Sequence, residues 1–176
     1  RQRFWVLLVV AFPLMWVFWP VLTSQQNFVY RDAGHYYFPL YQYLADQWHQ
    51  GRIPLWNPYD NLGQPLLANP TSAVLYPGKL FFVLPFSYDM NFNLYVVGHI
   101  CLAAGSCFLC ARRWGVGFHG AAFAALAYTM SGSVLFQYCN PVFLVGASWL
   151  PLAFLAIERM LRLNSTGAAV LLGSVL

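Results

Sequence analysis

The feature that most constrains the fold is a series of apolar stretches, each close to the length of a membrane-crossing helix. A bilayer core about 30 Å thick requires roughly 20 apolar residues in a helix. We expect spans at residues 4–22, 90–111, 116–138 and 141–157, and the start of a fifth at 167–176. Charged residues make up only 8% of the chain, whereas soluble domains carry roughly 25%. The predicted fold class is therefore all-α, a polytopic transmembrane helical bundle.

Arginine residues at the ends of the predicted spans indicate their orientation. If the spans alternate in direction, these cations fall on one side of the membrane: Arg1, Arg3, Arg112, Arg113, Arg159 and Arg162. Cytoplasmic flanks are enriched in Lys and Arg, so we expect this side, and with it the N-terminus, to be cytoplasmic. The polar loop 23–89 and the turn Cys139–Pro141 are then external. The net charge is +4, but the basic residues form no continuous stripe along the sequence. This argues against nucleic acid as a partner.

The external loop carries helix and turn signals of its own. Asp32 can cap a helix that follows it, Pro39 should kink or restart that helix, and Gly51 can end it. The X-Pro pairs after Gly51 favour extended or turn geometry. A short apolar stretch at 75–86 is expected to lie in the membrane interface or to dip into it. The sequence thus predicts a large external loop that carries interfacial helices.

Three residues near the start of the loop are candidates for chemistry. Asp32 lies about ten residues beyond the first span, where a carboxylate can accept a proton from a hydroxyl or hold a divalent cation. Arg31 can pair with a phosphate. His35 lies one helical turn after Asp32, on the same face, and can join it in a metal site or a proton relay. Simpler roles stay open: a helix cap for Asp32, an interfacial anchor for Arg31 and a hydrogen-bonded surface residue for His35.

A rigid run of aromatic, amide and proline residues follows. Residues 54–59 read PLWNPY and include Trp56, Asn57 and Tyr59, and Asn69 precedes a further proline. Aromatic faces provide flat apolar surfaces, and amide groups provide both donors and acceptors, as sugar binding requires. The alternative interpretation is a rigid cap that covers the helical bundle, and the two are compatible.

Several motifs of this loop occur together in a fixed order. They are Asp32, Tyr37-x-Pro39-Leu40, Gly51-x-x-Pro54-Leu55-Trp56-Asn57-Pro58-Tyr59, Gly63-x-Pro65-Leu66, Ala68-Asn69-Pro70 and Tyr76-Pro77. Downstream motifs are Ala111-Arg112-Arg113-Trp114-Gly115, Ser131-Gly132 and Trp149-Leu150-Pro151-Leu152. In this order and spacing the chain resembles YfhO-like bacterial membrane proteins, a branch of the GT-C glycosyltransferase superfamily. Because the chain begins with Arg1 and stops inside an apolar stretch, we expect it to be an N-terminal part of such a protein.

The resemblance implies an integral enzyme of the bacterial plasma membrane. Such an enzyme transfers a sugar from a polyprenyl-phosphate donor to a glycan, lipid or protein acceptor on the external face. Asp32 matches the catalytic carboxylate of the first external loop. The expected substrate-binding residues are Arg31, His35, Trp56, Asn57, Tyr59, Asn69 and Lys79. Arg31 and Lys79 would offset charge on the leaving phosphate. A divalent cation is a possible cofactor, with Asp32 and His35 as its candidate ligands.

Two other classes of function stay open. A transporter or flippase would place ionisable residues near the middle of the membrane, where His99 is the sole candidate. A non-catalytic membrane assembly protein could retain the same architecture, and the loss of Asp32 would then leave its function intact.

Overall fold

The computed structural model describes residues 2–23 and 25–163, together with residues 167, 170 and 173. The chain is mostly helical, which confirms the dominant element of the predicted fold class. It divides into two compact units. The helical unit contains Arg1–Phe18, Gly98–Gln137 and Phe143–Leu176, and the loop unit contains Trp19–Val97 and Tyr138–Val142. The predicted fifth span, 167–176, lies mostly outside the described residues, as does Arg1.

Helices lie in each of the segments 4–22, 90–111, 116–138 and 141–157. They are α1 (Gln2–Leu22), α3 (Tyr88–Arg113), α4 (Phe118–Thr129), α5 (Gly132–Leu135), the 3-10 helix η3 (Phe136–Cys139) and α6 (Pro141–Leu163). Within the described residues, two helices are long and apolar enough to cross a membrane, Tyr88–Arg113 and Pro141–Arg162. The described apolar part of α1, Phe12–Leu22, is shorter. The core helix of a soluble protein can have the same length and apolar composition. A multi-pass topology is therefore a proposal.

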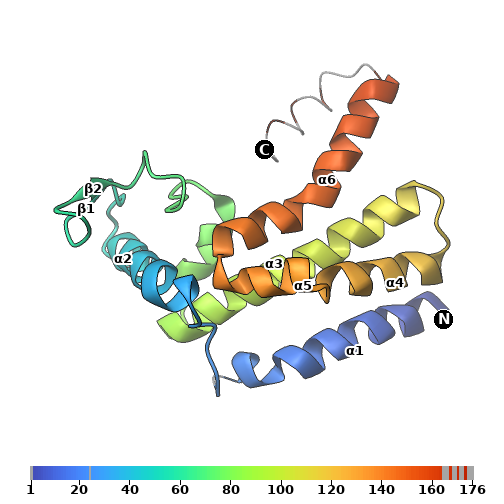
Figure 1. Cartoon of the computed structure of the whole chain (residues 1–176), viewed down its shortest axis with the longest axis horizontal. Coiled ribbons are helices and arrows are strands. Elements are labelled where there is room, and N and C mark those ends of the chain that lie inside the picture. The colour runs from blue at the N-terminus through green and yellow to red at the C-terminus, as the bar shows by residue number, and fades with distance from the viewer. Residues whose placement is uncertain (1, 24, 164–166, 168–169, 171–172, 174–176) are drawn as a thin grey trace. The chain divides into compact units, whose positions relative to one another are not determined.

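Small residues bring the helices of the helical unit close together. The chain turns between α3 and α4, which lie side by side (Figure 1) with the Phe108 and Phe118 rings 5.3 Å apart. Ser106 on α3 donates a hydrogen bond of 2.9 Å to the carbonyl of Ser148 on α6. Ala121 and Ala125 on α4 are fully buried. Small side chains let helix backbones approach closely enough for such contacts, as is common between membrane helices.

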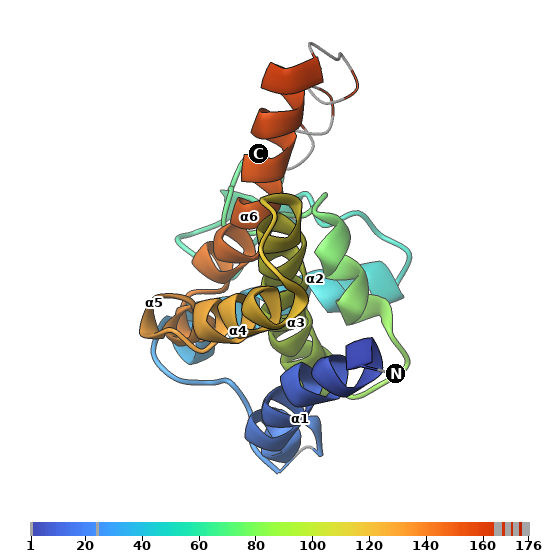
Figure 2. The ribbon, with the colours of Figure 1, turned by 90° about the vertical axis from the view of Figure 1, so that its right-hand side faces the viewer.

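The helix α6 changes direction along its length, as both views show (Figure 1, Figure 2). Pro151 lies inside the helix. A proline there removes one backbone hydrogen bond and its ring clashes with the preceding turn, which bends the helix.

The segment 116–138 differs from the single uninterrupted helix that the sequence predicts. The structure divides it into α4, α5 and η3. The Thr129 hydroxyl donates to the carbonyl of Ala125 at 2.8 Å, and the Ser131 hydroxyl donates to that of Tyr128 at 2.7 Å. Ser131 adopts an extended backbone conformation, with ψ at 144°. Such local side-chain bonds compete with the helix ladder, so α4 ends before Ser131.

The loop unit is built around a broken helix. A π-helical turn, η1 (Ala33–Tyr37), leads into α2 (Phe38–His49), and the two-residue strands β1 (Trp56–Asn57) and β2 (Gln64–Pro65) form an antiparallel pair. Pro39 lies in the first turn of α2, so the predicted restart there is confirmed. Gly51 follows the helix end with φ at +70°, as predicted. The stretch 75–86 forms only a short 3-10 helix, η2 (Pro77–Val83).

The prediction that Asp32 caps a helix is wrong. A capping residue takes a non-helical backbone conformation so that its side chain reaches the free amides of the first turn. Asp32 is already helical, with φ −61° and ψ −29°, and its side chain forms no capping hydrogen bond. The sharp change of direction occurs one residue earlier, at Arg31, whose φ is +54°. The carboxylate of Asp32 is left exposed.

A buried asparagine ties the start of the loop to the start of α3. Asn93 is fully buried, and its side-chain amide donates to the carbonyls of Val21 and Gln26, both at 2.9 Å. Its side-chain oxygen accepts a hydrogen bond from the backbone amide of Phe28 at 3.3 Å. These bonds satisfy backbone groups that would otherwise be buried without partners. They fix the path of the chain as it leaves α1.

The core of the loop unit is a cluster of aromatic rings centred on Tyr41. Its ring lies 5.5 Å from Phe82 and 5.8 Å from Tyr95, in edge-to-face geometry. Lys79, only 3% exposed, places its amine 2.7 Å from the centroid of the Tyr41 ring. This amine has no hydrogen-bond partner within the described part of the chain. Burial lowers the pKa of Lys79 well below its ordinary value of 10.5, which disfavours the charged form of the amine.

We predict that Lys79→Met stabilises the protein at neutral pH. A buried donor without a partner costs about 1–3 kcal/mol, and methionine of similar length removes that cost. The folded state excludes a proton that the unfolded state binds below pH 10.5. The wild type therefore loses stability as the pH falls below that value, and the advantage of Lys79→Met narrows as the pH rises towards it.

Thermal unfolding of the purified protein across pH 7–10.5 measures both effects. Arg52→Met is the control, because Arg52 is an exposed cation of the same loop and its loss should change little. A Lys79→Met variant that is less stable than the wild type at neutral pH would show that the amine is charged and favourably held.

Candidate functional site

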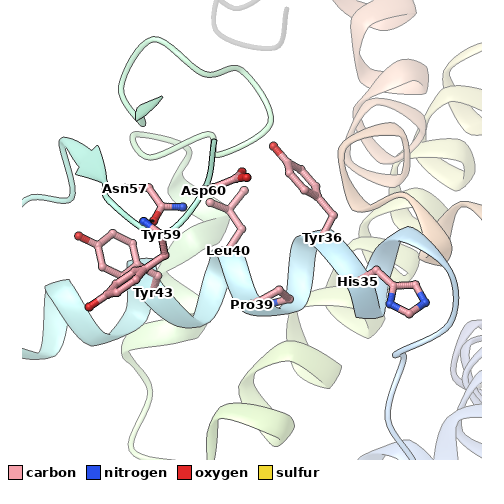
Figure 3. Close-up of a pocket in the computed structure, with 8 residues that line it drawn as sticks. All are labelled: His35, Tyr36, Pro39, Leu40, Tyr43, Asn57, Tyr59 and Asp60. Carbon is pink, nitrogen blue, oxygen red and sulfur yellow. Dashed lines mark hydrogen bonds between the residues drawn. The ribbon is translucent and has the colours of Figure 1, made fainter. Parts of the chain in front are cut away.

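A cavity of about 410 Å³ lies in the loop unit, between α2 and the turn that joins β1 to β2. Its walls combine aromatic, amide, imidazole and carboxylate groups (Figure 3). The lining residues are His35, Tyr36, Pro39, Leu40, Tyr43, Asn57, Tyr59 and Asp60. In Figure 3 the tyrosines Tyr43 and Tyr59 lie at one end of the cavity and His35 at the other.

Helical spacing supplies one wall of the cavity. Tyr36, Leu40 and Tyr43 recur at intervals of four and three residues, which places them on one face of η1 and α2. Tyr41 and Leu44 extend from the adjoining face of α2 and are fully buried, Tyr41 within the aromatic core. Because that core fixes the rotation of the helix, the cavity face is fixed as well.

The β1–β2 turn supplies the other wall. The backbone amide of Tyr59 donates to the Asn57 side-chain oxygen at 3.0 Å, which closes an Asx turn. The amide of Gly63 donates to the carbonyl of Asp60 at 2.8 Å. The Tyr43 hydroxyl donates to the carbonyl of Trp56 at 2.9 Å and so ties the turn to α2. Asn57, buried at the base of the turn, and Asp60 are thereby held over the helix.

A network of polar side chains supports the cavity from behind. The side-chain amide of Gln64 donates to the Asp60 carboxylate. Asn69 links this pair to α2, because its amide donates to Gln64 at 3.2 Å and to the Tyr36 hydroxyl at 3.4 Å. The Tyr36 hydroxyl also shares a hydrogen bond of 2.8 Å with Thr71. A connected network of this kind is more rigid than separate hydrogen bonds.

Asp32 lies beside the cavity lining in sequence, and a different set of residues holds it. The Tyr37 hydroxyl donates to the Asn140 side-chain oxygen at 2.6 Å. The amide of Asn140 therefore faces Asp32, at 3.5 Å from Oδ2. Burial raises the pKa of Tyr37, and the charges of Tyr36 and Asp32 raise it further, so its hydroxyl stays protonated and keeps this orientation. The structure thus brings the turn at Asn140 to the start of the external loop.

The structure brings some of the predicted site residues together and leaves others apart. His35, Asn57 and Tyr59 line the cavity, and Asn69 supports it from behind. Trp56 is exposed and packs against Gly63 outside the cavity. Arg31 is exposed in the sharp turn before Asp32.

Lys79 does not join the residues of the cavity. Its amine is enclosed by the rings of Tyr41, Tyr95 and Phe82. The amine is turned onto the Tyr41 ring and away from solvent, whereas the predicted role beside a phosphate requires an accessible cation.

The residues do not fit a protein-held metal site. Within the described ranges, no group of three or more His, Cys, Asp or Glu side chains lies close enough together to hold a metal ion. Asp32 and His35 supply at most two ligands, whereas hard divalent cations take about six oxygen ligands.

Five of the eight residues that line the cavity are absent from the predicted site, namely Tyr36, Pro39, Leu40, Tyr43 and Asp60. The two tyrosines could have been predicted from their helical spacing, since they share a helical face with His35 and Pro39. No sequence pattern indicates Asp60, because its position depends on the conformation of a turn in which Asn61 and Leu62 both have positive φ. Residues other than glycine rarely adopt that conformation, so sequence alone does not indicate it.

We predict that Gly63→Ala destabilises the turn that carries Asp60. Gly63 has φ at +104°, and a Cβ atom there would lie 2.6 Å from the Trp56 ring. Gly51→Ala is the matched control, because Gly51 has φ at +70° but no atom within 4 Å of a new Cβ. Positive φ costs each variant about 1–2 kcal/mol, and only Gly63→Ala adds a steric clash. Thermal unfolding should show the larger loss for Gly63→Ala, and equal losses would contradict the packing of this turn on Trp56.

Comparisons with known proteins identify no family for this chain. No protein-family description, curated protein or solved structure matches the chain.

Proposed function

We propose that this chain belongs to an integral membrane glycosyltransferase of GT-C type, which transfers a sugar from a polyprenyl-phosphate donor to a cell-envelope acceptor. The observation that carries the proposal is the pairing of two features in the loop unit. One is a cavity with aromatic and amide walls, and the other is the exposed carboxylate of Asp32, held by Asn140. His35 lines the cavity three residues after Asp32.

The cavity suits a sugar in size and chemistry. Its volume of about 410 Å³ falls in the range of about 300–1,000 Å³ found for small-molecule sites. Tyr36, Tyr43 and Tyr59 offer ring faces for the apolar face of a pyranose, and Asn57 and Asp60 offer polar groups for its hydroxyls. The polar network through Asn69 keeps these groups in place. A rigid site loses less entropy on binding, which favours affinity for a small uncharged ligand.

Asp32 is proposed as the general base. Its carboxylate takes the proton of an acceptor hydroxyl while the hydroxyl oxygen attacks the anomeric carbon of the donor sugar. The bond from that carbon to the phosphate oxygen breaks, and the polyprenyl phosphate leaves with the bonding electrons. Arg31, exposed beside Asp32, is the cation that offsets the charge on the leaving phosphate.

The location proposed for the protein is the bacterial plasma membrane, crossed several times. Exposed apolar side chains support it, since α6 alone exposes Phe143, Phe154 and Leu161. Large exposed apolar patches are unusual on soluble monomers. The positive-inside rule places the loop 23–89 and the turn at Asn140 on the same external side, and the contact between Asn140 and Asp32 agrees with that placement.

We predict that Asp32→Asn lowers sugar transfer by about 10²–10⁴-fold, the usual contribution of a general base. Cells that lack the gene are complemented with the full-length wild type or variant, and their lipid-linked and envelope glycans are profiled. The wild type should restore one modified glycan, and Asp32→Asn should not. Asp46→Asn is the control, because Asp46 is an exposed carboxylate on α2 outside the cavity.

The alternatives give different results in the same experiment. If Asp32→Asn restores the glycan as well as the wild type does, the assignment of Asp32 as the base fails, which is the outcome expected of a non-catalytic assembly protein. If deletion of the gene leaves every glycan unchanged, the transferase proposal itself is wrong.

The proposed orientation has its own test. Leu62 lies at the tip of the β1–β2 turn and is fully exposed, so Leu62→Cys should react with a membrane-impermeant maleimide in intact cells. Arg113→Cys, at the end of α3, should react only after lysis. Both substitutions are made in a background from which the native cysteines have been removed. The reverse pattern would invert the topology.

A further inference from the structure

A second hollow in the loop unit is a groove of about 430 Å³ between the end of α2 and the chain that leads into η2. Its walls are formed largely by apolar side chains, among them Trp48, Val74, Leu75, Leu80 and Val83. The sugar-binding cavity uses none of these residues. We propose that this groove binds one acyl chain of a bilayer phospholipid.

The first argument concerns charge. Between Asp60 and Asp89 the sequence contains a single charged residue, Lys79. Lys79 contributes to the wall of the groove, but its amine is turned onto the Tyr41 ring and away from solvent. No formal charge therefore faces an occupant of the groove. A peptide backbone or a sugar would leave polar groups without partners there, whereas a hydrocarbon chain would not.

The second argument concerns exposure. Leu75 is 78% exposed and Leu80 is 70% exposed, and Val83 and Phe86 are exposed too. A water-facing loop of this length normally carries charged residues on its surface. Here the apolar side chains face outward and the lysine side chain is buried, which is the reverse of the usual arrangement. Such a surface is stable against hydrocarbon rather than water.

The third argument identifies the source of the hydrocarbon. η2 ends at Val83, and α3, long and apolar enough to cross a membrane, begins at Tyr88. The groove is therefore only a few residues from the point at which the chain enters the bilayer. Phospholipid is the most abundant hydrocarbon at that depth. This inference rests on the membrane location within the proposed function but not on the transferase activity.

Photolabelling tests the groove directly. The full-length protein is reconstituted in vesicles that contain a phospholipid with a diazirine at the middle of one acyl chain. After irradiation, adducts are mapped by mass spectrometry of peptides. We expect adducts on residues 74–83 as well as on α3. Val83→Trp and Leu75→Trp fill the groove from two positions on its wall, and each should lower the yield on residues 74–83 several-fold.

Leu62→Trp is the matched control, because it adds the same indole ring at an exposed leucine outside the groove. It should leave the yield on residues 74–83 unchanged, and adducts on α3 should be equal in all proteins. The acyl-chain site is overturned if α3 is labelled but residues 74–83 are not. It is also overturned if neither groove-filling variant lowers the labelling of residues 74–83. If α3 itself is unlabelled, the membrane location fails, and the groove proposal fails with it.

Discussion

The packing of aromatic rings around Tyr41 is the interaction on which the loop unit depends. Phe82 from η2 and Tyr95 from α3 meet this ring in the interior. Each edge-to-face pair contributes about 0.5–1.5 kcal/mol beyond the burial of its surface. Because the cluster joins α2, η2 and the start of α3, it fixes the rotation of α2 about its axis. The face of α2 that carries Tyr36 and Tyr43 is therefore directed towards the β1–β2 turn.

Both hollows of the loop unit follow from this packing. One side of α2 meets the β1–β2 turn, and the polar network through Asn69 closes a cavity with hydroxyl, amide and carboxylate groups. The end of the helix, at Trp48, meets the apolar chain around η2 and forms a groove without charge. The enclosure of the Lys79 amine among the rings contributes to both outcomes. It keeps a cation away from the groove, and it costs stability that an apolar residue would not.

The position of Asp32 shows how the architecture serves the proposed chemistry. A capping carboxylate would be occupied by backbone amides, whereas that of Asp32 makes no capping bond and remains exposed. Its neighbour in space is Asn140, more than a hundred residues along the chain. Tyr37, whose pKa burial raises, orients that amide. A carboxylate that is exposed to solvent and also contacts a fixed amide is suited to receive a proton from a bound hydroxyl.

The sequence by itself determined the helical character of the chain, the helices α1, α3 and α6, the restart at Pro39 and the stop at Gly51. These features depend on local properties, namely apolar length and the backbone restrictions of proline and glycine. It also indicated His35, Asn57 and Tyr59, which the structure gathers around one cavity. The indication there came from residue type, because aromatic and amide groups suit both sugar binding and a rigid cap.

Only the tertiary structure decided the interruption of segment 116–138, the burial of Lys79 and the placement of Asp60 at the cavity. The burial of Lys79 depends on contacts between residues far apart in sequence, and the placement of Asp60 depends on a rare backbone conformation. The interruption depends on local hydrogen bonds of Thr129 and Ser131 that compete with the helix ladder. A lysine in an exposed polar loop is expected to face water, and only the rings of Tyr41 and Tyr95 show that this one does not. Asp60 reaches the cavity because two successive residues, Asn61 and Leu62, adopt positive φ. Local propensity disfavours that conformation, and the packing of the turn on α2 through Tyr43 compensates for it.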